Sequence, residues 1–162
     1  MRTGIGYDIH RLIPSIKQSF IKLGGVEIIC YYRLDAHSDG DVLLHSLTDA
    51  CLGALALGDI GQWFPDSKDE NKNRPSSDFL KTVVQEIHRL GWEIHQTDSI
   101  VILEEPKISI HADNIRRSIA NILQIELSAV SVKAKSAEGM GAIGHRKAIA
   151  CQAVVTLKER LK

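Results

Sequence analysis

Residues 41–58 read DVLLHSLTDACLGALALG, and this stretch predicts a buried helix around which the rest of the chain is organised. Ser38, with Asp41 three residues later, has the pattern of a residue that caps a helix N-terminus, and Gly58 is a natural stop. The apolar residues that recur at helical spacing are Leu43, Leu47, Ala50 and Ala54. We therefore expect a helix that begins just after Ser38 and ends at Gly58.

Strands are expected before this helix and a loop after it. Residues 3–12 are β-prone, and the paired glycines Gly24 and Gly25 supply the positive φ of a hairpin turn. Residues 62–78 are polar, charged and broken by two prolines, which makes them the one long loop and a candidate lid over a binding site.

The C-terminal half alternates helices and strands. A second helix is expected to be capped by Ser77 and to end at Gly91, and a third helix covers about 115–123. The segments expected as strands are 99–105, 129–135 and 148–158. Strands at both ends with helices between them predict an α+β fold, in which a mixed sheet is covered by helices on one face.

Composition excludes several classes of function. The 162 residues, 44% of them hydrophobic and 25% charged, suit a single folded domain over 1–162. Twenty basic residues balance twenty acidic ones, so the charge expected of a nucleic-acid-binding protein is missing. We see no signal peptide and no membrane-spanning stretch. The odd, widely spaced Cys30, Cys51 and Cys151 indicate reduced, buried thiols, and we expect a cytoplasmic protein.

Asp8 and His10 are candidate metal ligands, because residues two apart on a strand point to the same face. An isolated pair of this kind is more often simply a polar strand surface. On the predicted helix, Asp41, His45 and Asp49 share one polar stripe, so His45 is expected to face two carboxylates. Together with Asp8 and His10, His45 would complete three protein ligands and leave a fourth position open, as in catalytic zinc sites.

A third cluster, VKAKSAEGMG at 132–141, runs from a strand into a glycine-rich turn. The turn could cradle a phosphate, or it could be a plain hairpin turn after a strand with solvated lysines. Glu104 and Glu105 are equally ambiguous, since they mark either the end of a strand or the rim of a pocket.

Four segments together closely resemble the 2-C-methyl-D-erythritol 2,4-cyclodiphosphate synthase family, and their order and spacing cover nearly the whole chain. They are GYDIH at 6–10, AHSDGDVLLH at 36–45, LGDIGQWFPD at 57–66 and KAKSAEGMG at 133–141. The resemblance implies a phosphorus–oxygen lyase of non-mevalonate isoprenoid synthesis. Such an enzyme converts 4-diphosphocytidyl-2-C-methyl-D-erythritol 2-phosphate into 2-C-methyl-D-erythritol 2,4-cyclodiphosphate and releases CMP.

The resemblance also implies roles for individual residues. Zinc would be held by Asp8, His10 and His45, and Mg²⁺ or Mn²⁺ by Glu138, while His37 and Ser136 would stabilise the transition state. The residues implied at the methylerythritol end of the substrate are Ser38, Asp59, Ile60, Gly61, Phe64, Pro65 and Asp66. Those implied at the cytidine end are Leu103, Pro106, Lys107, Ala134 and Lys135. Asp8, His10, His37, Ser136 and His145 complete the implied substrate contacts.

Members of this family are homotrimers with active sites between neighbouring subunits, so we expect a homotrimer whose sheets face the trimer axis. The sequence departs from the family pattern at Ser136, where threonine is usual, and over 142–148, where the family commonly has an aromatic residue and then GRGEG. Two alternatives belong to other classes: a zinc-dependent hydrolase of nucleotide diphosphates, and a non-catalytic trimeric protein that binds a nucleotide or an isoprenoid.

Overall fold

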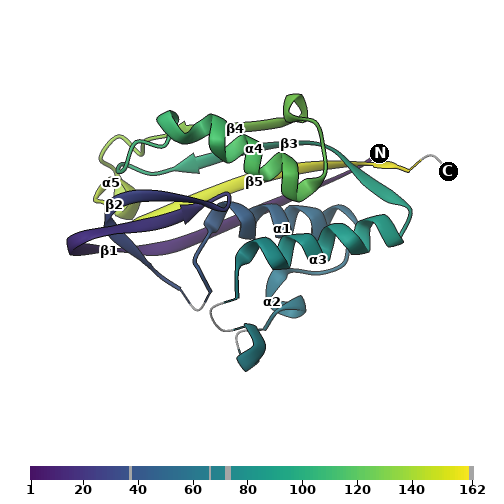
Figure 1. Cartoon of the computed structure of the whole chain (residues 1–162), viewed down its shortest axis with the longest axis horizontal. Coiled ribbons are helices and arrows are strands. Elements are labelled where there is room, and N and C mark those ends of the chain that lie inside the picture. The colour runs from purple at the N-terminus through teal and green to yellow at the C-terminus, as the bar shows by residue number, and fades with distance from the viewer. Residues whose placement is uncertain (37, 66, 72–73, 161–162) are drawn as a thin grey trace.

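Five strands form one mixed sheet in the computed structural model, which describes residues 1–36, 38–65, 67–71 and 74–160 (Figure 1). The strands are β1 (Arg2–Leu23), β2 (Val26–Asp35), β3 (Trp92–Ile102), β4 (Val130–Lys135) and β5 (Ala148–Glu159). Their order across the sheet is β2-β1-β5-β3-β4. Only β3 and β4 run parallel, and the other three pairs are antiparallel. The expected α+β domain with a mixed sheet is confirmed.

Three longer helices pack on one face of the sheet and share a single hydrophobic core with it. They are α1 (Val42–Ala54), α3 (Ser76–Arg89) and α4 (Ala112–Leu123). The sheet is curled, because α4 contacts both edge strands, β4 and β2. The short helices α2 (Ile60–Trp63) and α5 (Gly141–Gly144) and the 3₁₀ turns Asp69–Asn71, Ser109–His111 and Leu127–Ala129 complete the described elements.

The predicted starts of two helices were wrong, and so was the predicted end of the first, because α1 ends at Ala54 rather than at Gly58. Asp41, not Ser38, caps α1, because its carboxylate accepts a hydrogen bond from the backbone N–H of Leu44. Ser77 lies inside α3, which begins at Ser76 directly after Pro75. Proline suits this place because its ring sets φ and the first turn of a helix does not need its missing N–H.

Two glycines let α1 lie directly on β1. A Cβ at Gly4 would come within 2.0 Å of the Ala50 carbonyl oxygen, and a Cβ at Gly6 within 1.9 Å of the Ser46 carbonyl oxygen. Because side chains alternate along a strand, the next residues of this set, Asp8 and His10, point to the same face toward α1. The glycines therefore bring the helix close enough for its side chains to meet those of the strand.

Asp41 ties α1 to the β1–β2 turn. It is fully buried, and its two carboxylate oxygens accept from the backbone N–H groups of Gly24 at 2.9 Å and Gly25 at 2.7 Å, in addition to Leu44. One side chain thus satisfies three backbone donors, and two of them, those of Gly24 and Leu44, would otherwise be buried without a partner.

Replacing Asp41 with alanine is expected to lower the free energy of unfolding by about 3 kcal/mol, because two buried N–H groups and that of the exposed Gly25 lose their acceptor. Urea unfolding followed by circular dichroism measures this. Asp113→Ala is the control, since Asp113 lies in the first turn of α4 but its side chain is 82% exposed and should matter little. Equal unfolding midpoints for the two variants would contradict the anchoring role of Asp41.

The face of the sheet opposite the helices carries exposed apolar side chains on β1, β2 and β5. They are Ile5, Tyr7, Ile9, Phe20, Ile29, Tyr31 and Val154, each between 37% and 66% exposed. A large exposed apolar surface usually marks a contact with another protein.

The three cysteines are free and buried, as expected, and burial raises the pKa of Cys51 and Cys151 to about 12. Among the described residues, no helix has both the length and the hydrophobicity needed to cross a membrane.

Candidate metal centre and substrate pocket

Asp8, His10 and His45 meet between β1 and α1. The His45 Nδ1 atom lies 3.0 Å from Asp8 Oδ2 and 3.3 Å from His10 Nε2, and the third pair, His10 Nε2 and Asp8 Oδ2, is 3.2 Å apart. The other carboxylate oxygen of Asp8 accepts from the backbone N–H of Ile9 at 2.9 Å, which fixes the orientation of the carboxylate. The sequence-based prediction that these three side chains converge is confirmed.

The geometry of this cluster fits a tetrahedral metal ion. Zinc binds imidazole nitrogen and carboxylate oxygen at about 2.0–2.2 Å, so tetrahedral ligand atoms lie roughly 3.3 Å from one another. The three distances between Asp8, His10 and His45 match this separation closely. Three protein ligands leave a fourth position for substrate.

The charges of the cluster support one another. Burial alone would raise the pKa of Asp8, but its hydrogen bond to His45 and the nearby imidazoles lower that pKa below its usual value. Burial lowers the pKa of His45, but the hydrogen bond and charge of Asp8 outweigh burial and raise that pKa. A carboxylate held in its charged form beside two imidazoles is suited to binding a cation.

The expectation that His45 faces Asp41 and Asp49 was wrong. Asp41 is turned into the core, where it binds the β1–β2 turn. Asp49 accepts from the backbone N–H of Ile60 at 2.7 Å and thereby holds the start of α2. The carboxylate that His45 contacts is that of Asp8 on β1. The contact therefore joins a helix to a strand, whereas we expected contacts between residues of the same helix.

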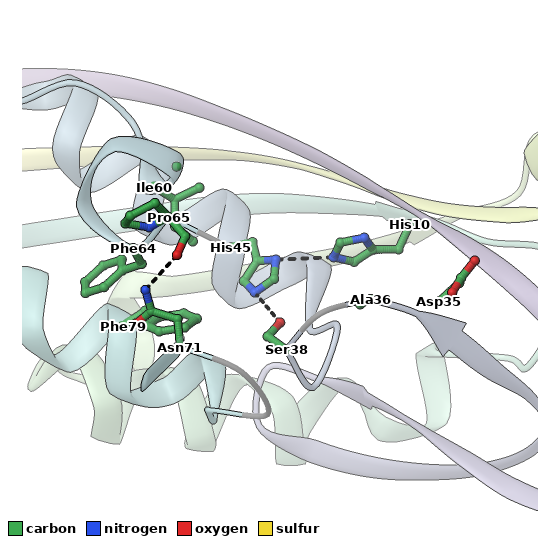
Figure 2. A pocket seen from close by; sticks show the side chains of 11 residues that line it. His10, Asp35, Ala36, Ser38, His45, Ile60, Phe64, Pro65, Asn71 and Phe79 are labelled. Atoms are coloured by element: carbon green, nitrogen blue, oxygen red, sulfur yellow. Dashed lines mark hydrogen bonds between the residues drawn. The ribbon is translucent and has the colours of Figure 1, made fainter. Parts of the chain in front are cut away.

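A pocket of about 470 Å³ opens beside the cluster (Figure 2). Its lining includes His10 and His45 and five residues expected at the methylerythritol end of the substrate: Ser38, Ile60, Gly61, Phe64 and Pro65. Sequence analysis missed four lining residues: Asp35, Ala36, Asn71 and Phe79. Figure 2 shows His45 between His10 and Ser38. The aromatic rings of Phe64 and Phe79 lie on the opposite side of His45 from His10.

The predicted long loop builds much of this pocket. Phe64 stacks on Phe79 of α3 with ring centroids 4.5 Å apart, and the Arg74 guanidinium lies over both rings at 5.5 and 5.1 Å. Asp59 is not among the lining residues, and its carboxylate caps α2 by accepting from the Gln62 N–H. Two further predicted site residues, His37 and Asp66, lie outside the described residues.

The residues expected at the cytidine end gather where β3 and β4 end. These two strands are parallel and pair Ile102 with Lys135, so Leu103 and Lys135 are neighbours, and the Leu103 N–H donates to the Lys135 carbonyl at 2.9 Å. Ala134 and Lys135 are exposed at the end of β4, and Pro106 and Lys107 lie four and five residues after the end of β3. Carboxyl ends of parallel strands are a common place for ligands.

The glycine-rich turn after β4 holds a carboxylate of its own chain. Oε1 of Glu104 accepts from the backbone N–H groups of Ala137 at 2.7 Å and Gly139 at 3.3 Å. The Ser136 hydroxyl donates to Glu138 Oε1 at 2.6 Å, and Glu138 adopts a φ of 50°, which is uncommon outside glycine. Glu104 therefore anchors the turn that presents Ser136 and Glu138, and it occupies two of the N–H groups with which the turn was expected to bind a phosphate.

The two groups of predicted residues lie far apart within one chain. Across the sheet, Asp8 pairs with Cys151, Cys151 with Val101, and Val101 with Ala134. Three strand spacings, or roughly 14 Å along the sheet, separate β4 from the strand that carries Asp8 and His10.

Comparison with known proteins assigns the chain to a family. Residues 1–158 match the family model described as the YgbB family. The chain belongs to the YgbB family. A curated relative from Treponema denticola, named 2-C-methyl-D-erythritol 2,4-cyclodiphosphate synthase, is 50% identical over 153 residues, which are 94% of this chain and 93% of the relative.

Two solved structures have the same fold as this YgbB-family chain. The chain is similar to "IspF (Plasmodium falciparum) CDP complex", with a TM-score of 0.87 and 38% identity over 99% of this chain and 97% of the other. It is also similar to a CDP-bound 2C-methyl-D-erythritol-2,4-cyclodiphosphate synthase, with a TM-score of 0.89 and 31% identity over 97% of this chain and all of the other. The family expected from the sequence motifs is confirmed.

His145, which was expected to touch substrate, follows the last residue of α5 and is exposed. It does not line the pocket beside Asp8, His10 and His45. The next residue, Arg146, pairs with Glu105 at 2.9 Å. The segment that departs from the family pattern is therefore tied to the segment that follows β3.

Proposed function

We propose that Asp8, His10 and His45 form the zinc-binding half of the active site of this cyclodiphosphate synthase, and that the turn bearing Ser136 and Glu138 forms the other half. The enzyme converts 4-diphosphocytidyl-2-C-methyl-D-erythritol 2-phosphate into 2-C-methyl-D-erythritol 2,4-cyclodiphosphate and releases CMP. The observation that carries the proposal is the three-ligand cluster, whose spacing suits zinc, beside an open pocket in a chain of this family.

The two halves are proposed to come from neighbouring copies of the chain. Two cations that act on one diphosphate lie about 3.5–4 Å apart, whereas the cluster and β4 are separated by roughly 14 Å along the sheet of one chain. The exposed apolar face of β1, β2 and β5 supplies a surface on which copies can associate. A homotrimer with these faces toward its axis would bring the metal cluster of one copy to the Ser136–Glu138 turn of the next.

The residues have separate tasks in this proposal. The pocket lined by Ser38, Ile60, Gly61, Phe64 and Pro65 holds the methylerythritol end, and the ends of β3 and β4 hold the cytidine. Cations at the two halves would neutralise the charge of the diphosphate, zinc at the cluster and Mg²⁺ or Mn²⁺ at Glu138. The hydroxyl of Ser136 can donate to a phosphate oxygen, and we propose the same role of charge stabilisation for His37.

The bond changes need no protein nucleophile. An oxygen of the substrate's 2-phosphate forms a bond to the β-phosphorus while the bond from that phosphorus to the CMP oxygen breaks. Holding the two phosphates in line gives the attacking group a high effective concentration, so the protein acts by positioning and charge neutralisation.

This assignment predicts that no solvent oxygen enters the products. The reaction is run in oxygen-18 water with zinc and Mg²⁺ or Mn²⁺ present, and the masses of CMP and of the cyclic diphosphate are measured. Both products should be unlabelled, because the attacking oxygen belongs to the substrate.

Label in CMP or in the organic diphosphate would show that water attacks, and would favour the nucleotide-diphosphate hydrolase. Tight nucleotide binding without any CMP release would favour the non-catalytic binding protein. A control incubation of unlabelled products in oxygen-18 water shows whether exchange with solvent occurs after the reaction.

A further inference from the structure

We propose that Ser76 and Asp39 position His45 as a metal ligand by determining which of its ring nitrogens carries the hydrogen. This inference rests on the zinc site proposed above. His45 Nδ1 faces Asp8 and His10, so it is the nitrogen that would bind the metal. His45 Nε2, on the other side of the ring, lies 2.8 Å from the Ser76 hydroxyl oxygen.

Asp39 determines which way the hydrogen bonds run between Asp39, Ser76 and His45. A carboxylate can only accept, and Oδ1 of Asp39 accepts both the Ser76 hydroxyl and, at 3.2 Å, the Ser76 backbone N–H. Because the single hydroxyl hydrogen of Ser76 is directed at Asp39, its oxygen is left to accept from His45 Nε2–H. The Asp8 carboxylate can accept a second hydrogen from His45 Nδ1, and a metal ion would take the place of that hydrogen. A neutral imidazole that keeps its hydrogen on Nε2 then presents its Nδ1 lone pair, which is the form that a metal requires.

The surroundings make this chain of contacts strong. Ser76 is fully buried, and the Asp39 side chain is 16% exposed. Lys22, at the end of β1, lies with Nζ 3.6 Å from Asp39 Oδ2 and compensates the charge of the carboxylate. Hydrogen bonds at sites shielded from water are stronger, and an unpaired group there is costly. Ser38 Oγ lies farther from His45 Nε2, at 3.2 Å, and accepts from the Gly40 N–H.

The contacts also join the metal cluster to the substrate pocket. Asp39 precedes α1, and Ser76 is the first residue of α3, directly after the polar segment that carries Phe64 and Asn71. Phe79, one turn further along α3, lines the pocket. The residue that orients His45 therefore begins the helix that forms one wall of the substrate site.

Ser76→Ala is expected to weaken zinc binding about 10- to 100-fold, the usual cost of losing a partner that orients a metal ligand. The zinc dissociation constant is measured on metal-free protein by competition with a colour-forming chelator. The matched control is Ser77→Ala, the same change one residue later on α3, where the Ser77 side chain has no partner among the described residues. Ser77→Ala should bind zinc like the unaltered chain.

Two further variants separate positioning from general stability. Ser76→Thr keeps the hydroxyl but adds a methyl group at a fully buried position, so it should melt at a lower temperature yet bind zinc tightly. Asp39→Ala frees the Ser76 hydroxyl to donate to His45 Nε2, which favours hydrogen on Nδ1, and should weaken zinc binding as much as Ser76→Ala. Because Asp39 acts on His45 through Ser76, the zinc affinity of the double variant should be no lower than that of the single variant that binds zinc less tightly.

Zinc affinity in Ser76→Ala equal to that in Ser77→Ala would overturn the proposal, as would fully additive losses in the double variant. If Ser76→Ala does not fold, Asp39→Ala decides by the same criterion. If the unaltered chain released no CMP while Ser76→Ala still weakened zinc binding, the proposed function would be contradicted and this inference would stand. If the unaltered chain released CMP and both single variants bound zinc with unchanged affinity, the proposed function would stand and this inference would be contradicted.

Discussion

Replacing His45 with alanine is expected to abolish zinc binding and CMP release together. The change removes one of three ligands whose atoms lie within 3.3 Å of one another. The loss of zinc affinity should exceed the 10- to 100-fold cost of losing an outer partner, because a ligand that binds the ion directly is removed. Elemental analysis of the purified protein and an assay of CMP release measure the two effects, and His10→Ala should behave in the same way.

His95→Ala is the control for this experiment, since His95 is an exposed histidine on β3 and lies outside the cluster. It should keep both zinc and activity. One zinc ion per chain in both His10→Ala and His45→Ala would show that the ion is bound elsewhere.

Mixing two inactive variants is expected to restore activity. In a cyclic trimer with sites between neighbours, His10→Ala damages one half of each site and Glu138→Ala damages the other. Random mixing of equal amounts joins two undamaged halves at about a quarter of the interfaces, so co-expression should recover up to about a quarter of the CMP release. The two variants are co-expressed with different tags, and mixed trimers are purified through both tags before the assay. Each purified mixed trimer has one undamaged site out of three, so the purified fraction should recover up to about a third of the CMP release.

The control pair is His10→Ala with His45→Ala. Both changes damage the same half, so no interface in their mixed trimers is intact and no activity should return. Verified mixed trimers of His10→Ala and Glu138→Ala without recovered CMP release would reject the shared site. A monomeric mass of the unaltered chain in solution would reject its premise.

Local spacing was enough to predict several parts of the site. Asp8 and His10 share a face because strand side chains alternate, and the apolar repeat of 41–58 identified α1 and with it His45. The motif SAEGMG placed Ser136 and Glu138 on a turn, which the structure shows after β4. These predictions succeeded because each depends on residues a few positions apart, whose relative directions the backbone period determines.

Contacts between distant segments were decided only by the tertiary structure. The helical period placed Asp41 and Asp49 beside His45, but both side chains are directed elsewhere. Asp41 is buried against the β1–β2 turn, and Asp49 accepts a hydrogen bond from the first backbone N–H of α2. Likewise, nothing in the local pattern indicated that Glu104 would bind the turn at 137–139. Which polar group a side chain reaches depends on which elements pack together, and a local period does not contain that information.

The same reason separates the cluster of Asp8, His10 and His45 from the residues that contact it. The sequence by itself determined the family, the α+β class and the three residues that could hold a metal ion, since these depend on motifs and on short spacings. Only the packing of α3 against α1 brought Ser76 to His45, a contact between residues 31 positions apart. The hydrogen bond depends on how closely two helices approach, and that distance is set by the whole core rather than by either segment.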